Sequence, residues 1–191
     1  MIPAPAQNLY LHRESPVPSA SRSAPIAQFN KQGIFSALTE EQQKRLIAGA
    51  RVLRFGRGER IVRQNEEGSS MFLILEGSAE VLVASTGEEL HVADLRAGEA
   101  FGEMSLLTGE KRSASVIART DCELWEIDRA VLMPILQDNP ELARHLSELL
   151  AHRKVETDGL LAKQTPTHLV ENSRNEYAKG FLRRITALFE I

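Results

Sequence analysis

Cysteine and long apolar stretches are both scarce in this chain of 191 residues. Cys122 is the single cysteine, so the chain cannot form an internal disulfide or a zinc site built from several cysteines. No run approaches the roughly 20 apolar residues of a membrane span, and the N-terminus lacks the apolar segment of a signal peptide. These absences predict a soluble chain and fit a reducing compartment.

Neither sign of charge dominates. The chain has 23 Lys and Arg against 26 Asp and Glu, for a net charge of −3. A nucleic-acid binder normally carries a strongly basic face, so we expect no nucleic-acid partner. Hydrophobic residues make up 42% of the chain, which is enough to build a buried core.

Proline is absent from residues 26–133, whereas residues 1–30 hold five of the eight prolines together with Ser and Ala. Such a composition is typical of an extended linker. We therefore predict a linker over residues 1–30, a folded domain over residues 31–160 and a tail over residues 161–191.

Eight of the twelve glycines lie between Gly56 and Gly109, where they separate short apolar runs. Short strands at about ten-residue spacing, with glycine turns, are typical of an antiparallel barrel or jelly roll. We predict a mainly β fold, an antiparallel β-roll or jelly-roll barrel with flanking helices. The expected strands are Met71–Leu75, Glu80–Val83, Leu90–Leu95, Ser115–Ala118 and Glu123–Ile127, with turns at residues 76–78 and 85–87.

Helices are predicted on both sides of the strand region. Thr39–Gln42 reads as a capping box that opens a helix before the first strand. Residues 129–137 predict a short helix that Pro134 should bend or break. Asp138–Glu141 then opens a longer helix, which Gly159 is expected to stop.

One segment, Phe101–Val116, groups residue types that suit a sugar phosphate. Gly102 lets the backbone approach a ligand, and the residues after it suit a short helix whose free N–H groups can point at an anion. Glu103 supplies a carboxylate for a sugar hydroxyl. Arg112 supplies a planar charged fork for phosphate oxygens, and Ser113 adds a hydroxyl. Their order and spacing together predict a nucleotide site.

This segment resembles the phosphate-binding cassette of cyclic-nucleotide-binding domains, and the order of parts is similar over residues 31–160. Phe55–Ile61 resembles the family's early strand, Met71–Gly77 its central strand, and Gly98–Glu103 the run into the cassette. The resemblance implies a helix, an eight-stranded β-roll interrupted by the cassette, and two further helices. Lys111 departs from the family, since many members have proline there, at some cost in loop rigidity.

The resemblance also implies a role for each matching residue. Glu103 would hold the ribose 2′-hydroxyl of cyclic AMP or cyclic GMP, and Arg112 would pair with the cyclic phosphate. Ser113 would donate to a phosphate oxygen or to a syn guanine. Backbone amides would complete the anion site at Gly102, Glu103, Met104 and Ser105. The base could lie against side chains that suit plain barrel core equally well: Val81, Val83, Val92 and Phe101.

Arg153 is open to two interpretations. It falls on the same helical face as Leu146 and Leu149, so its guanidinium could stack on the base as part of a lid. Alternatively, it is a solvated arginine between His152 and Lys154.

The N-terminal residues Ile2–Leu11 are similar to the closing strand of the cytoplasmic domain in small-conductance mechanosensitive channels, although Ala4 stands where that family has an aromatic residue. Some bacterial channels of that family continue through a linker into one nucleotide domain. The resemblance implies the regulatory part of such a channel, on the cytoplasmic side of the inner membrane, with its own channel subunits as partners. A voltage-type channel terminus competes with this interpretation. The short remainder disfavours a following helix-turn-helix domain, and the second nucleotide domain of a kinase regulatory subunit is not visible.

Residues 177–191 repeat apolar side chains at helical spacing with Lys and Arg between them. Such a basic amphipathic helix suits an anionic membrane surface or packing on its own domain or a neighbouring subunit. Residues 161–176 look polar and poorly ordered.

Two other functions compete with a ligand-binding domain. A metal-dependent barrel enzyme would need His and carboxylate ligands on adjacent strands, and His91 is the only histidine in the strand region. No nucleophile–base pair is visible either, so we expect no enzyme activity, no metal and no cofactor. A barrel that has lost its ligand and serves only in assembly is the second rival, and the presence of both Glu103 and Arg112 argues against it.

Overall fold

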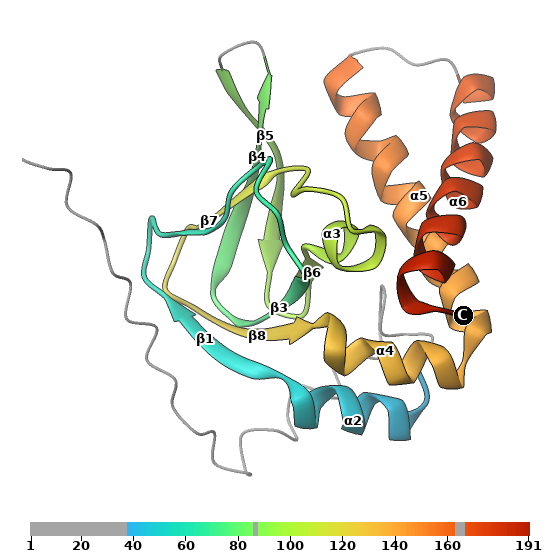
Figure 1. Ribbon diagram of the computed structural model, residues 1–191. Coiled ribbons are helices and arrows are strands. Elements are labelled where there is room, and N and C mark those ends of the chain that lie inside the picture. Colours follow the sequence, from blue (N-terminus) through green and yellow to red (C-terminus); the bar gives the residue numbers. More distant parts are fainter. Residues whose placement is uncertain (1–37, 86–87, 163–166) are drawn as a thin grey trace, which may run out of the picture.

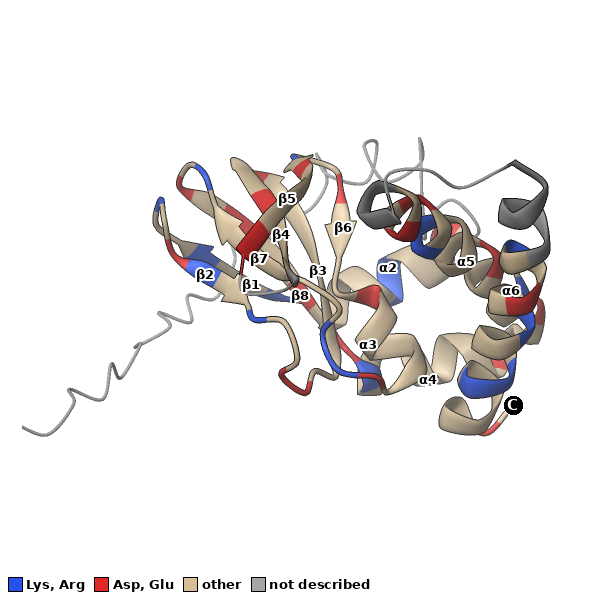
Figure 2. Cartoon of the chain, turned by 90° about the horizontal axis from the view of Figure 1, so that it is seen from above, with Lys and Arg blue, Asp and Glu red and all other residues tan. Residues whose placement is uncertain are grey.

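The computed structural model describes residues 38–85, 88–162 and 167–191, which form a β-roll with helices packed along one side (Figure 1). The linker, the segment that resembles a channel and the predicted turn at residues 86–87 lie outside the described residues. Acidic and basic side chains are interspersed over the roll and the helices (Figure 2).

Two four-stranded antiparallel sheets make up the described roll, in the orders β1-β8-β3-β6 and β2-β7-β4-β5. The β-roll predicted from the sequence is therefore confirmed. The first strand and the two-residue β6 had no clear sequence signal of their own. The strands are β1 (Arg51–Phe55), β2 (Arg60–Val62), β3 (Ser70–Glu76), β4 (Ser78–Ser85), β5 (Glu88–Arg96), β6 (Ala100–Phe101), β7 (Ser115–Ala118) and β8 (Cys122–Asp128).

Strand β3 is buried on both faces and joins two hydrophobic clusters. Met71 and Leu73 pack against the helices, whereas Phe72 and Ile74 point into the roll. Successive side chains of a strand face opposite sides, so a continuous apolar run fits a strand with a core on each side. Strand β3 therefore lies between the interior of the roll and the layer of helices.

The helices are α2 (Glu40–Gly49), α3 (Glu103–Thr108), α4 (Arg129–Asp138), α5 (Pro140–Ala162) and α6 (Thr167–Phe189). The capping box predicted at Thr39 is confirmed, because its side chain accepts from the Gln42 backbone while the Gln42 side chain accepts from the Thr39 backbone. Helix α3 lies between β6 and β7, where the cassette was expected. Helices α5 and α6 form an antiparallel pair beside the roll (Figure 1).

Three helix predictions were wrong in part. Helix α4 continues through Pro134, since one lost backbone hydrogen bond is outweighed by the buried side chains on either side of it. Helix α5 continues through Gly159 to Ala162, and α6 packs along α5. A glycine inside a helix costs only about 1 kcal/mol relative to alanine, so it does not by itself end one. Residues 167–176, expected to be poorly ordered, form the first half of α6.

The tail helix packs on its own domain. Phe181, Ile185 and Phe189 are buried in the same cluster as the helix-facing side chains of β3. The apolar face that a membrane-surface helix would need is therefore covered, and this favours packing on the domain over membrane contact. No helix in the described part of the chain is long and apolar enough to cross a membrane.

Candidate functional site

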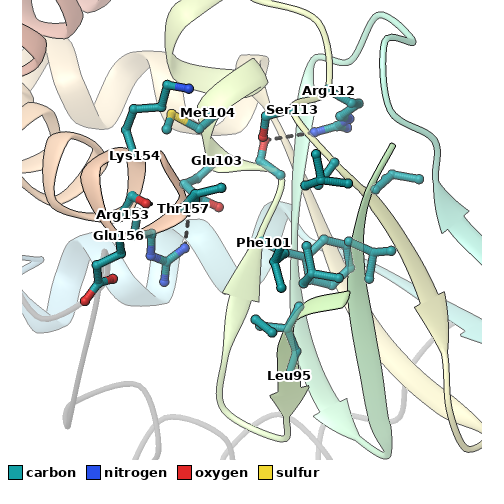
Figure 3. A pocket seen from close by; sticks show the side chains of 18 of the residues that line it. Leu95, Phe101, Glu103, Met104, Arg112, Ser113, Arg153, Lys154, Glu156 and Thr157 are labelled. Carbon is teal, nitrogen blue, oxygen red and sulfur yellow. Dashed lines mark hydrogen bonds and ion pairs between the residues drawn. The ribbon is translucent and has the colours of Figure 1, made fainter. Parts of the chain in front are cut away.

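A cavity of about 870 Å³ lies between the roll, the segment from Gly102 to Ser113 that we call the cassette, and helix α5 (Figure 3). This volume falls within the roughly 300–1,000 Å³ of ordinary small-molecule sites. Every residue proposed from the sequence for ligand contact lines it. They are Val81, Val83, Val92, Phe101, Gly102, Glu103, Met104, Ser105, Arg112, Ser113 and Arg153.

Arg112 is buried at the end of the cassette, with only 6% of its surface exposed. Its Nη1 donates to the Ser70 carbonyl at 2.7 Å and to the Gly102 carbonyl at 2.8 Å, and its Nη2 donates to Ser70 Oγ at 3.3 Å. The guanidinium carbon also lies 5.6 Å from the centre of the Phe72 ring. These contacts fix the orientation of the guanidinium before any ligand arrives.

Two glycines make room for this arginine. A Cβ built on Gly68 would stand 2.2 Å from Arg112 Nε, and one on Gly102 would stand 2.6 Å from Nη1. Gly102 also has φ of +79°, a left-handed backbone that favours glycine. The backbone of Arg112 is tied to the β2–β3 loop, because its N–H donates to the Glu66 carbonyl and its carbonyl accepts from Asn65. The loop and the cassette therefore position Arg112 together.

The positive charge of Arg112 has no close negative partner in the described chain. Its hydrogen bonds go to carbonyl and hydroxyl oxygens, and no described carboxylate comes within 4.0 Å. Burial lowers the pKa of this guanidinium, while the carboxylates of Glu103 and Glu126 act in the opposite direction. An arginine stays charged in proteins, and a buried charge without a counter-ion is unfavourable. The site therefore favours an anion at Arg112.

Helix α3 adds a second unsatisfied group. Ser105 is 1% exposed and lines the cavity, and its Oγ has no hydrogen-bond partner among the described residues. A buried hydroxyl without a partner is disfavoured, so a ligand with an acceptor or donor there would be stabilised. The sequence suggested only the backbone amide of Ser105 as a contact.

Glu103 and Arg153 join the cassette to helix α5. The Glu103 side chain is 8% exposed, and its Oε1 lies 2.7 Å from Arg153 Nη1, which also donates to the Ala100 carbonyl at 3.1 Å. Arg153 points from α5 toward Glu103 (Figure 3). The Glu103 carboxylate raises the pKa of Arg153. Arg153 is therefore not a free solvated side chain. Its guanidinium is already paired with Glu103, so it is not held ready only to stack on a base.

The other end of the cavity is mostly apolar. Val83 and Phe101 are buried in the wall, Val81 and Val92 are half-buried, and the Phe101 ring is stacked on Phe72 at 5.2 Å between centres. Flat apolar surfaces of this kind suit the faces of a planar ring.

Sequence reasoning missed several residues of the site. Gly68 and Ser70 hold Arg112 from more than forty positions away in the chain, and no local pattern marks them. Thr157 and Asp158 on α5 also line the cavity. The spacing of four residues between Arg153 and Thr157 places both on one helical face, and this signal was available.

The described residues contain no group of three or more His, Cys, Asp and Glu side chains arranged to hold a metal ion. The single cysteine, Cys122, is buried away from the cavity lining. The chemistry that the site offers is therefore recognition of an anion joined to a polar and an apolar part.

Comparison with known proteins agrees with this geometry. A family model described as "Cyclic nucleotide-binding domain" matches residues 52–139. The chain is also 32% identical over 151 residues to the cyclic AMP receptor protein of Thermus thermophilus, covering 78% of this chain and 68% of that protein. The chain belongs to the cyclic nucleotide-binding domain family. The resemblance seen in the cassette is confirmed at this level.

The chain is also similar to a kinase regulatory subunit in sequence and to a solved domain in fold. It is 30% identical to a cAMP-dependent protein kinase regulatory subunit of Dictyostelium discoideum, covering 70% of this chain and 43% of that subunit. It spans between 12% and 43% of the length of four kinase relatives. A crystal structure of a cyclic nucleotide-binding domain from Methylobacillus flagellatus shares the fold, with a TM-score of 0.64, 24% identity, and coverage of 84% of this chain and 94% of that one.

Proposed function

We propose that this chain is a regulatory domain that binds a 3′,5′-cyclic nucleotide, cyclic AMP or cyclic GMP, in the cavity beneath α5. The observation that carries the proposal is Arg112, a buried cation held in place by neutral oxygens and left without a described counter-ion. A cyclic phosphate carries one negative charge and presents oxygens to a guanidinium fork. The ligand thereby supplies the charge that the protein lacks.

The remaining contacts follow from the position of the phosphate. The Ser105 and Ser113 hydroxyls and the backbone N–H groups from Gly102 to Ser105 surround the phosphate oxygens. Glu103 accepts a hydrogen bond from the ribose 2′-hydroxyl and keeps its pairing with Arg153 on the other oxygen. The base then lies along the apolar wall of Val81, Val83, Val92 and Phe101, and Arg153 approaches it from α5. No residue is assigned a catalytic step in this scheme.

We further propose that the output of binding is the gating of an ion channel. The support is the similarity of Ile2–Leu11 to the end of a mechanosensitive-channel cytoplasmic domain, in residues that lie outside the described structure. The relatives named above favour a second candidate, a cyclic-nucleotide sensor that controls a kinase or transcription. The genomic sequence upstream of Met1 separates the two: an in-frame segment encoding membrane helices supports the channel, and a stop codon directly upstream contradicts it.

Isothermal titration calorimetry of the purified chain tests ligand binding. We expect tight one-to-one binding of cyclic AMP or cyclic GMP, with linear 5′-AMP as a control that binds far more weakly because its phosphate carries a second charge and lacks the ring. Absence of heat with both cyclic nucleotides, in folded protein freed of copurified ligand, would contradict the proposal. That result would instead support the ligand-free assembly barrel.

A further inference from the structure

Helix α6 contacts both walls of the cavity, although none of its described side chains lines the cavity itself. It packs along α5 on one side and against the cassette helix α3 on the other. Figure 1 shows α6 beside α5, with its C-terminal end turned toward the helical layer below the roll. The buried side chains of Phe181, Ile185 and Phe189 form the apolar part of this contact.

The contact with the cassette is made just before Arg112. Arg184 forms an ion pair with Glu110, two residues ahead of the anion-binding arginine. Leu188 lies against Gly109, where a Cβ would stand 3.7 Å from Leu188 Cδ2. The turn is stiffened internally, since the Glu110 N–H donates to Thr108 Oγ1 at 3.2 Å. A displacement of the turn at Gly109 and Glu110 would therefore change the contacts that this turn makes with α6.

The contact with α5 is made at residues that line the cavity. Tyr177 Oη donates to Asp158 Oδ2 at 2.9 Å, and Lys154 Nζ donates to Asp158 Oδ1 at 2.8 Å. Both Lys154 and Asp158 line the cavity. At the far end of α6, Gln137 of α4 donates to the Phe189 carbonyl at 3.3 Å. The helix is thus held near its middle, at Tyr177, and toward its C-terminal end, at Arg184 and Phe189.

We propose that α6 is a clasp that holds α5 against the cassette and so sets the rate at which ligand leaves the cavity. This inference rests on the proposed binding function. Without α6, α5 would be joined to the cassette by the Glu103–Arg153 pair, by the buried apolar cluster that α5 shares with α3, and by the chain through β7, β8 and α4. The two polar fastenings, Arg184–Glu110 and Tyr177–Asp158, are partly exposed, so each is weak and can open without unfolding the core. Opening of a lid limits the rate of product release in many enzymes, so contacts that hold a lid closed are expected to slow ligand release.

The test uses stopped-flow displacement of a fluorescent 8-substituted cyclic AMP analogue from the whole chain. The variant combines Arg184→Gln with Tyr177→Phe, which removes both polar fastenings and leaves the cavity lining intact. We expect dissociation about threefold to tenfold faster than in the wild type, with association changed less than about twofold. Arg183→Gln is the matched control, because Arg183 is exposed beside Arg184 and has no ion pair in the described chain.

The outcomes separate the clasp from the binding function. Faster dissociation in the double variant alone, with an unchanged circular dichroism spectrum, supports the clasp. Equal dissociation rates in all three proteins would overturn the clasp and leave the binding function standing. Failure of the wild type to bind the analogue, or cyclic AMP in calorimetry, would overturn both.

Discussion

The two walls of the cavity each present an arginine, and the two are used differently. Arg112, on the cassette wall, is 6% exposed and hydrogen-bonded to neutral oxygens. Arg153, on the α5 wall, has a side chain that is 42% exposed and paired with Glu103. The charge of Arg112 has no described counter-ion, and the roll and the cassette fix its position. The charge of Arg153 is paired with a carboxylate, and Arg153 lies on α5, which packs against α6.

This difference assigns separate tasks to the two walls. A buried, unpaired cation interacts strongly with an incoming anion because little water screens it. A paired and partly exposed cation adds little binding energy but joins two elements. We therefore propose that the cassette wall supplies most of the affinity, whereas the α5 wall positions the Glu103 carboxylate and closes the cavity.

The largest effect is expected from Arg112→Ala. Loss of this side chain should weaken cyclic nucleotide binding by about 2–5 kcal/mol, which is more than tenfold in affinity. Calorimetry measures the change, and Arg54→Ala serves as a control because Arg54 pairs with Glu123 and neither residue lines the cavity. An unchanged affinity would remove Arg112 from the site.

Glu103 is predicted to act through the ribose 2′-hydroxyl. A hydrogen bond to a charged group contributes about 1.5–3 kcal/mol, so 2′-deoxy cyclic AMP should bind the wild type more than about tenfold more weakly. In Glu103→Ala the same ligand change should cost almost nothing, because the acceptor is already gone. Equal losses in wild type and variant, measured as a double-mutant cycle, would show that the carboxylate does not contact the sugar.

Gly68→Ala tests how Arg112 is held. The added methyl would stand 2.2 Å from Arg112 Nε and should displace the guanidinium, at about 1–3 kcal/mol of overpacking. We expect weaker ligand binding and a lower melting temperature by differential scanning calorimetry. Gly180→Ala is the control, since nothing lies within 4 Å of its added Cβ. A normal affinity in Gly68→Ala would mean that the arginine does not need its present position.

Arg153→Ala should have the smallest effect. The pair with Glu103 is partly exposed on the arginine side, so its loss should weaken binding by about 1 kcal/mol or less. A titration with both cyclic nucleotides also measures any change in base preference. A loss as large as that in Arg112→Ala would contradict the division of tasks between the walls, and no change in affinity or base preference would end the lid role of Arg153.

The cassette could be predicted from the sequence because its parts are local. Gly102, Glu103 and Arg112 lie within one short segment, so their order alone predicted that they meet at one site, and all three line the cavity. The strands were predictable because glycines separate them, and the helix start at Thr39 because a capping box is a local pattern.

The surroundings of Arg112 could not be predicted in the same way. Its acceptors include the backbone carbonyl of Ser70, and its space depends on Gly68, which folding brings close from the distant β2–β3 loop. The amphipathic pattern of residues 177–191 showed that the tail is a helix, but not what its apolar face covers. Gly159 was a misleading stop signal because a glycine inside a helix costs only about 1 kcal/mol relative to alanine, and α5 continues past it to Ala162.

The role of Arg112 as the anion site is tested most simply by calorimetry on the wild-type chain, with a cyclic nucleotide compared with its own nucleoside. We expect adenosine to bind at least about thirtyfold more weakly than cyclic AMP, or guanosine than cyclic GMP, because only the phosphate satisfies Arg112. Arg112→Ala should remove most of this difference. Equal affinities of nucleotide and nucleoside for the wild type would contradict the claim that the buried arginine is the anion site.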